Sequence, residues 1–207
     1  MNYKLKSYRH GELILNNEPS YIKKWNELLK TIESITDDEI ILAHEANTRI
    51  PKGLSVALNK VIKEKLIAIG WIAESKIFND EEYSNKSWRL DFANENVSIE
   101  VAFNHGEAIA WNLVKPTIAS ELNHVQKEIK TDIAIVICAT KDLKTKGGFD
   151  NAVGEFEKFE RYLDPLRGLL TVPMVIIGLE APETFKIVHK KVNNTNQGIV
   201  YRIDSNN

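Results

Sequence analysis

Residues 88–103 read Trp88-Arg-Leu-Asp91-Phe-Ala-Asn-Glu-Asn-Val-Ser-Ile-Glu100-Val-Ala-Phe103. Their aromatic and β-branched residues, interrupted by Asn and Glu, predict two short strands, Trp88–Phe92 and Val97–Phe103, joined by a turn. A hairpin of this length brings an Asp and a Glu to the same end of a sheet. Apolar residues flank Glu100 on both sides, so its side chain points to the opposite face from theirs.

Two carboxylates a few ångströms apart suit Mg²⁺, which keeps several waters and takes its remaining ligands from substrate phosphate. The plain alternative is that Asp91 is a turn residue and Glu100 a solvent-facing strand residue, because both residue types are common at surfaces. The spacing alone leaves both interpretations open.

Upstream of the hairpin, apolar residues recur at three- and four-residue intervals and predict two helices, Pro19–Ile35 and Ser55–Ile69. Between them, His44–Gly53 has the Pro, Gly and polar character of a loop. A strand at Trp71–Phe78 then leads into the hairpin, so the middle of the chain is predicted to be a three-stranded meander.

Downstream, the pattern predicts a helix, a strand, a helix and a strand in succession. These are a helical stretch from Glu107 to about Lys130 with a kink at Pro116, the strand Ile133–Cys138, a helix around Asn151–Leu163 and the buried strand Val172–Gly178, with Lys141–Gly148 as a loop. Ile133–Cys138 is apolar on both faces and is therefore expected at the centre of the sheet. This succession predicts an α/β fold, with a mixed central β-sheet flanked by helices.

The composition bounds the class of protein. The chain has 207 residues, 43% of them hydrophobic, which is the size of one domain spanning residues 1–207. Cys138 lies in an apolar run, which indicates a buried, unpaired cysteine in a protein of a reducing compartment. No stretch of the sequence resembles a signal peptide or a membrane helix. We therefore expect a cytoplasmic protein, and the net charge of −2 argues against a protein that coats polyanions non-specifically.

The hairpin resembles the catalytic segment of the BglII and BstYI group of type II restriction endonucleases, within the PD-(D/E)XK nuclease superfamily. That group has Asp, eight residues, then Glu-Val-Gln-Phe, and this chain has Asp91, eight residues, then Glu100-Val101-Ala102-Phe103. Two further segments are similar to the group in the same order. The first comprises Val56-Ala-Leu-Asn59, Lys63-Glu-Lys-Leu66 and Gly70-Trp71, and the second Gly147-Gly-Phe149, Gly154-Glu-Phe-Glu157 and Pro173-Met-Val-Ile-Ile-Gly178.

The resemblance implies a restriction-endonuclease-like fold and a homodimer that cuts double-stranded DNA at a short palindromic site in a prokaryotic cytoplasm. Asp91, Glu100 and the backbone carbonyl of Val101 would bind Mg²⁺, and the products would carry 5′-phosphate and 3′-hydroxyl ends. The resemblance also places Asn59 beside the active site, although an Asn near a helix start is often a cap. Two strands need two active sites, which favours a two-fold dimer with an interface on helices from residues 20–70 or 107–130.

Candidate DNA contacts lie in three places. The resemblance assigns Asn104 and His105, which otherwise form the turn before Gly106. In the other two segments, basic and amide side chains and glycine backbone suit the major groove or phosphates, with a solvated loop as the plain alternative. The candidates there are Lys144, Thr145, Lys146 and Gly147 in one segment and Asn47, Thr48 and Arg49 in the other.

Position 102 departs from the group. A methyl group cannot hold or polarise the attacking water, so three interpretations stand: a substitution that stops cleavage, a water-positioning group supplied from elsewhere, or a protein that only binds DNA. The close match of the flanking residues favours the first, in which case Gln, Glu or Lys at position 102 would restore cleavage. A structure-specific repair nuclease is a further alternative, but it would lack dedicated recognition loops such as 43–53 and 141–151.

Overall fold

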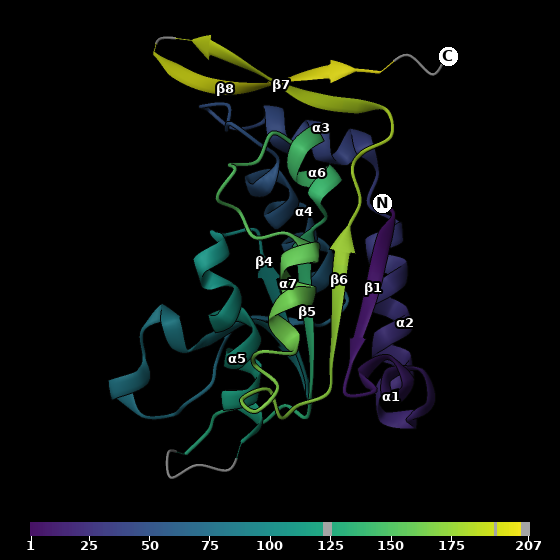
Figure 1. Ribbon diagram of the computed structural model, residues 1–207, viewed down its shortest axis with the longest axis vertical. Helices are drawn as coiled ribbons and strands as arrows, with labels where there is room; N and C mark the ends of the chain where they lie inside the picture. The colour runs from purple at the N-terminus through teal and green to yellow at the C-terminus, as the bar shows by residue number, and fades with distance from the viewer. Residues whose placement is uncertain (122–125, 193, 204–207) are drawn as a thin grey trace.

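Six strands form one mixed sheet at the centre of the computed structural model, which describes residues 1–121, 126–192 and 194–203 (Figure 1). The sheet order is β1-β6-β5-β4-β3-β2. The strands are β1 (Tyr3–Tyr8), β2 (Ile72–Lys76), β3 (Arg89–Asn94), β4 (Val97–Ala102), β5 (Ile133–Ala139) and β6 (Met174–Leu179). β4, β5 and β6 run parallel, whereas the remaining pairs are antiparallel.

Helices cover both faces of this sheet. Alternate residues of β5 face opposite sides, so Ile135 and Ile137 pack toward α1 to α4 while Val136 and Cys138 pack toward α5 and α7. The helices are α1 (Gly11–Asn17), α2 (Pro19–Glu33), α3 (Asp37–Glu45), α4 (Ser55–Ala68), α5 (Ile109–Ser120), α6 (Lys141–Lys146) and α7 (Phe156–Leu163). The predicted α/β class, the central position of the buried strand and the meander β2-β3-β4 are confirmed.

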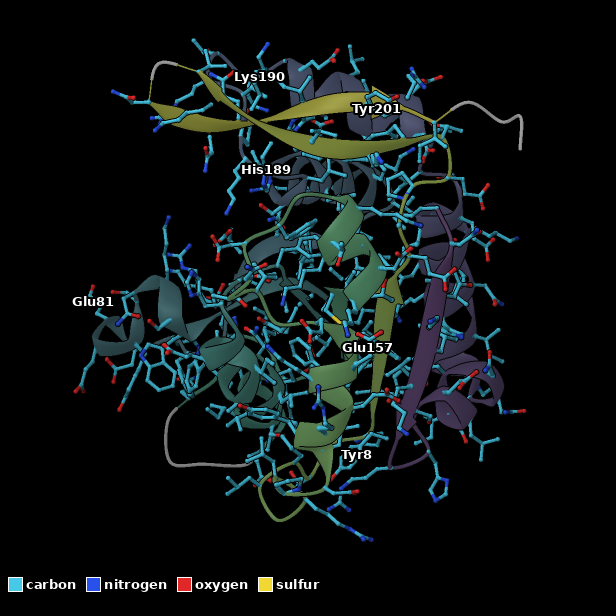
Figure 2. The ribbon with its side chains drawn as sticks, turned by 45° about the horizontal axis from the view of Figure 1, so that its top comes forward. Tyr8, Glu81, Glu157, His189, Lys190 and Tyr201 are labelled. Atoms are coloured by element: carbon cyan, nitrogen blue, oxygen red, sulfur yellow. The ribbon has the colours of Figure 1, made fainter. Side chains whose placement is uncertain are left out.

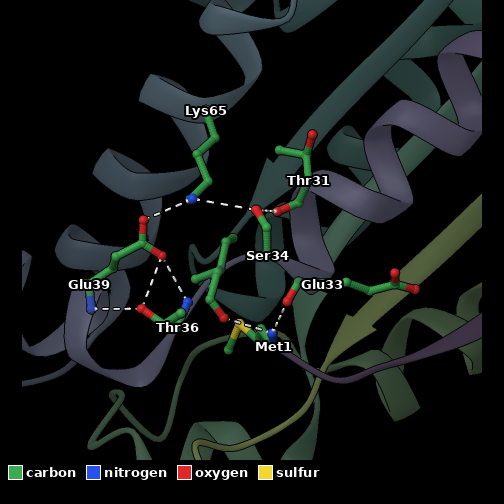
Figure 3. A network of polar contacts seen from close by, with 8 residues as sticks. Met1, Thr31, Glu33, Ser34, Thr36, Glu39 and Lys65 are labelled. Carbon is green, nitrogen blue, oxygen red and sulfur yellow. Dashed lines mark hydrogen bonds and ion pairs between the residues drawn. The ribbon is translucent and has the colours of Figure 1, made fainter.

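The connection between the helices α2 and α3 is held by side-chain contacts. Thr36 accepts a hydrogen bond from the backbone of Glu39, and the Glu39 carboxylate accepts one from the Thr36 backbone, which is a capping box at the start of α3. Glu39 also pairs with Lys65 of α4 at 2.8 Å (Figure 3). These contacts hold α3 against α4, the helix that lines one side of the candidate site.

Several predicted segments differ from the structure. The sequence predicts a loop at residues 141–148, but Thr140 caps the short helix α6 by accepting a hydrogen bond from the Leu143 backbone. The predicted loop at 44–53 begins inside α3, which the sequence pattern did not reveal. The helix predicted from 107 to about 130 ends at Ser120, because residues 126–128 bond to the backbone around Ile77 instead, and residues 122–125 lie outside the described residues.

A separate two-stranded sheet crosses one end of the molecule beyond α3 and α6 (Figure 1). It consists of β7 (Phe185–Val192) and β8 (Thr195–Arg202), and Figure 2 shows His189, Lys190 and Tyr201 on it. Gly198 lets β8 approach the 44–53 segment closely, since a Cβ there would lie 2.3 Å from the Lys52 carbonyl oxygen. No helix in the described part of the chain is long and apolar enough to span a membrane.

Candidate active site

The two carboxylates predicted from the sequence lie side by side on neighbouring strands. Phe92 of β3 pairs with Ile99 of β4 in the antiparallel register, which puts Asp91 directly opposite Glu100. Asp91 Oδ2 accepts a hydrogen bond from the Val101 backbone N–H at 2.8 Å, and the Asp91 N–H lies 3.4 Å from Glu100 Oε1. The side chains of Asp91 and Glu100 therefore make hydrogen bonds to the backbone next to the last residue pair of the β3–β4 ladder.

Burial governs the electrostatics of this pair. Glu100 is 1% exposed, and this burial, reinforced by the neighbouring Asp91 carboxylate, raises the pKa of Glu100 to about 8 against the opposing effect of Lys115. Burial also raises the pKa of Asp91, although Lys115 and the Val101 N–H favour its charged form. Two desolvated carboxylates with raised pKa values, facing one another in a cavity, are a typical setting for a functional site.

Lys115 completes the centre and was not predicted from the sequence. Its Nζ lies 2.5 Å from Glu100 Oε2, and its side chain is 8% exposed. Lysine is almost never buried without a partner, and Lys115 is the one charged residue of α5, whose other residues are mostly apolar. A lone lysine in an apolar helix was therefore the signal that could have revealed it.

A cavity of about 500 Å³ surrounds these three residues. It lies between α4, the strands β2 to β4, and α5. Its lining comprises Asn59, Lys63, Ala73, Glu74, Asp91, Phe92, Glu100, Val101, Phe103, Asn104, Trp111, Asn112 and Lys115. The structure therefore brings Asn59 and Asn104, both named from the sequence, into one cavity with the carboxylate pair, and it adds Lys63 and Asn112.

The donor set fits a hard divalent cation. Among the described residues, no group of three or more His, Cys, Asp or Glu side chains lies close enough together to hold a metal. Mg²⁺ commonly binds through only one or two carboxylates and takes waters and phosphate oxygens as its other ligands, so the Asp91–Glu100 pair suits it. A cation there would also relieve the repulsion and desolvation that raise the pKa of Glu100.

Ala102 lies on the same face of β4 as Glu100, two residues further along the strand. It is 2% exposed and belongs to the apolar cluster that includes Ile109 and Leu113 of α5. Its methyl group is therefore packed beneath α5, and position 102 presents no polar atom to the cavity.

The structure separates Asn104 from His105. Asn104 accepts a hydrogen bond from Asn112 Nδ2 at 3.0 Å at the edge of the cavity described above. His105 is exposed and lines a second cavity of about 670 Å³ with Arg161 and Tyr162 among its walls. The two neighbouring residues therefore line different cavities of the protein.

The α6 candidates are already engaged within the chain. Lys144 pairs with Glu155 at 2.6 Å, and both side chains are nearly buried, whereas Lys146 forms an exposed pair with Asp142. Exposed ion pairs contribute little to stability, so Lys146 can exchange its partner for a phosphate far more easily than Lys144 can. Thr145 donates to the Lys141 carbonyl, and the Gly147 carbonyl accepts from Leu54.

The 44–53 candidates are also held by the rest of the molecule. Asn47 donates to the carbonyls of Ala43 and His44 at the end of α3, and Arg49 donates to Thr195 of β8. The two segments named as recognition loops nevertheless lie against each other, because the Leu54 N–H bonds to Gly147 and Lys52 pairs with Asp150.

The model of the family described as restriction endonuclease BglII/BglIII matches residues 3–179, which include every strand of the central sheet and the whole candidate site. The chain belongs to this family. The match to the family model ends at residue 179, before the hairpin β7–β8 begins.

Two solved structures are similar over 98% of this chain and 100% of their own chains. One is a crystal structure of restriction endonuclease BglII complexed with a DNA 16-mer, with 17% sequence identity and a TM-score of 0.68. The other is free BglII, with 16% identity and a TM-score of 0.57. This likeness confirms the restriction-endonuclease-like fold that the hairpin indicated, whereas no curated protein sequence matches the chain.

Proposed function

We propose that this protein is a type II restriction endonuclease, which hydrolyses both strands of DNA at a short palindromic site with Mg²⁺ as its cofactor. The observation that carries the proposal is the buried pair Asp91 and Glu100, which lies in a polar cavity of a chain of the BglII/BglIII family. The whole chain from residue 1 to 207 acts as one endonuclease domain in a prokaryotic cytoplasm.

In this mechanism Asp91 and Glu100, with the Val101 carbonyl, would hold the cation. When bound, Mg²⁺ supplies a Lewis acid that activates a water and offsets the charge that develops on the scissile phosphate. The two carboxylates would fix the position of the cation relative to the sheet, because Asp91 and Glu100 lie opposite each other on neighbouring strands. The products are a 5′-phosphate and a 3′-hydroxyl.

DNA is the substrate that suits the surroundings of the cavity. Asn59 and Lys63 on α4 and Asn104 beyond β4 line the cavity with neutral amide groups and one ammonium group, which bind phosphate oxygens. His105, Lys146, Arg49 and Asn47 are further candidates for phosphate or groove contacts, as are Lys144, Thr145 and Gly147 with rearrangement of their present contacts. A homodimer supplies the second active site for the second strand.

A protein that binds DNA without cutting it is the second candidate function. The observation that favours it is Ala102, which places a buried methyl group where the similar enzymes carry a polar side chain. It differs from the first proposal in a measurable way, because such a protein binds a specific site in the presence of Mg²⁺ and leaves both strands intact.

Digestion of long DNA of known sequence, with Mg²⁺ and with EDTA, tests the proposal. We expect double-strand breaks at one short palindromic sequence, only with Mg²⁺, with ends that a DNA ligase can rejoin because they carry 5′-phosphate and 3′-hydroxyl groups. Breaks at random positions, or intact DNA at every protein concentration, would contradict a site-specific endonuclease.

A further inference from the structure

Lys115 reaches the carboxylate pair from a helix, whereas the pair itself lies on the two strands β3 and β4. It extends from α5, which packs over β4, and its Nζ lies 2.5 Å from Glu100 Oε2. Trp111 and Asn112, one turn earlier on the same helix, line the same cavity. α5 therefore presents one face to the acidic pair, and that face carries a single cation.

Position 102 on β4 has no room for a long side chain, whereas Lys115 on α5 reaches Glu100 directly. A residue at position 102 would share the face of Glu100, two positions along β4, but this place is filled by the methyl group of Ala102 beneath Ile109 and Leu113 of α5. A long side chain on the strand would have to displace that packing. The helix instead directs a long side chain to the carboxylate from above.

A charge in this position suits phosphodiester hydrolysis. Two carboxylates alone repel both the scissile phosphate and the extra negative charge of its transition state, whereas a fixed ammonium beside the buried Glu100 stabilises that charge. The three N–H groups of an ammonium can orient a water while one of them still bonds to Glu100. Lys63 lines the same cavity but is exposed, so solvent screens its charge more strongly.

We propose that Lys115 is a catalytic residue that supplies from α5 the cationic, water-orienting group missing at Ala102, so that the site is complete as it stands. This proposal rests on the nuclease function proposed above. In the DNA complex, Lys115 Nζ donates hydrogen bonds to the attacking water and to a non-bridging oxygen of the scissile phosphate.

The reaction balances without any change in Lys115. The water oxygen forms a new bond to phosphorus, and the bond from phosphorus to O3′ breaks with its electron pair remaining on O3′. One water proton passes to solvent, and O3′ takes a proton from solvent, which gives a 5′-phosphate and a 3′-hydroxyl. Ala102 has no part in this step, because its methyl group is packed away from the cavity.

The variant Lys115→Met tests the proposal, because it removes the charge and keeps an apolar stem of similar length. The matched control is Lys24→Met, which breaks another short lysine–carboxylate pair away from the cavity, Lys24 with Glu95 at 2.5 Å, in which the lysine is 15% exposed and the carboxylate 75% exposed. Three quantities are measured on a duplex that contains the mapped site. They are the single-turnover cleavage rate with Mg²⁺, the DNA affinity with Ca²⁺ in place of Mg²⁺, and the thermal midpoint of the protein alone.

We expect Lys115→Met to cleave about a hundredfold more slowly than the parent or slower still, with DNA affinity changed by less than about threefold and a cooperative thermal transition. Lys24→Met should cleave at the parental rate. A Lys115→Met protein that cleaves within about threefold of the parent would overturn the proposal, and so would a loss of cleavage matched by an equal loss of DNA affinity.

Two more variants keep the test decisive if Lys115→Met does not fold. Lys115→Gln retains a hydrogen bond to Glu100 without the charge, and we expect it to be at least about tenfold slower, so the parental rate would overturn the requirement for a cation. Ala102→Gln forces a larger side chain beneath α5 and is expected to bring no gain, whereas a large acceleration would show that position 102 is truly deficient.

The behaviour of the unmodified protein distinguishes a failure of the Lys115 inference from a failure of the proposed nuclease function. A parent that cuts only with intact Asp91, and cuts equally well without Lys115, retains the proposed function and loses this inference. A parent that binds its site tightly but never cuts overturns the inference and favours the DNA-binding alternative. A parent that neither binds nor cuts DNA overturns the proposed function itself.

Discussion

Glu100 combines burial, a neighbouring carboxylate and a contact with an ammonium group at one position of the site. Its carboxyl group is 1% exposed, and it faces Asp91 on one side and Lys115 on the other. Burial and the neighbouring Asp91 carboxylate disfavour the charged form of Glu100 more than Lys115 favours it, so the folded protein holds a proton there more tightly than the unfolded chain does. Stability and metal binding are therefore linked at this one group.

The metal-free protein should lose stability as the pH rises from about 5 to about 8. The pKa of Glu100 is about 8 in the folded protein and near 4.5 in the unfolded chain, so the folded state holds the extra proton across this window. The stabilisation is complete below the unfolded pKa and is lost as the pH passes the folded one. Urea unfolding in EDTA at several pH values measures the effect.

Glu100→Gln is the control for this pH dependence, because its amide does not titrate. We expect its free energy of unfolding to vary less with pH across the same window than that of the parent. Identical pH profiles for the two proteins would contradict the assignment of the shifted pKa to Glu100.

The sequence predicted that Asp91 and Glu100 lie close together, but it did not reveal their contact with Lys115. Asp91 and Glu100 are joined by a hairpin, whose register follows from the length of the turn and the alternation of side chains. Lys115 reaches Glu100 only because α5 packs over β4, and no local pattern determines that tertiary contact. Its isolation in an apolar helix was a signal for burial, but not for its partner.

The long elements of the fold follow from periodicity, and the short ones depend on contacts. α2 and α4 begin at the predicted residues, Pro19 and Ser55, because each has an apolar stripe at helical spacing. α6 has only six residues and was predicted as a loop, since its stability comes from the Thr140 cap and from packing of Leu143.

The elements at the two ends of the chain were not predicted at all. β1 is an edge strand whose alternation of partly buried and exposed residues is weak, and it is fixed by its antiparallel pairing with β6. The hairpin β7–β8 is largely exposed and polar, and its position is set by backbone bonds such as Gly198 to Pro51. Patterns of burial cannot reveal an element that buries so little of its own surface.

At the scale of the whole molecule, three apolar side chains are exposed on the helices α3 and α4, in a region proposed for the dimer interface. Leu42 of α3 is 72% exposed, and Val56 and Ile67 of α4 are each 48% exposed. They lie within residues 20–70, which is one of the two regions that the sequence suggested for an interface. Two subunits joined there would carry one Asp91–Glu100 pair each, one for each strand of a palindromic site.

Leu42→Glu should shift this protein from dimer to monomer, because a charge on an apolar interface opposes association. Leu13→Glu on α1, which changes a residue 61% exposed and outside that region, should remain dimeric. Sedimentation velocity at micromolar concentration distinguishes the two. A monomeric parent, with and without DNA, would contradict the two-subunit arrangement, and a dimeric Leu42→Glu would exclude α3 as the interface.

The most direct test of the central claim, that Asp91 and Glu100 form the metal centre of a DNA-cutting enzyme, is a paired measurement on Asp91→Ala. Cleavage with Mg²⁺ and affinity for the same DNA without metal are compared with those of the parent. We predict that cleavage is abolished while affinity is kept or increased, because removal of a carboxylate from a phosphate-binding cavity relieves repulsion. Undiminished cleavage by Asp91→Ala would contradict the assignment of this site.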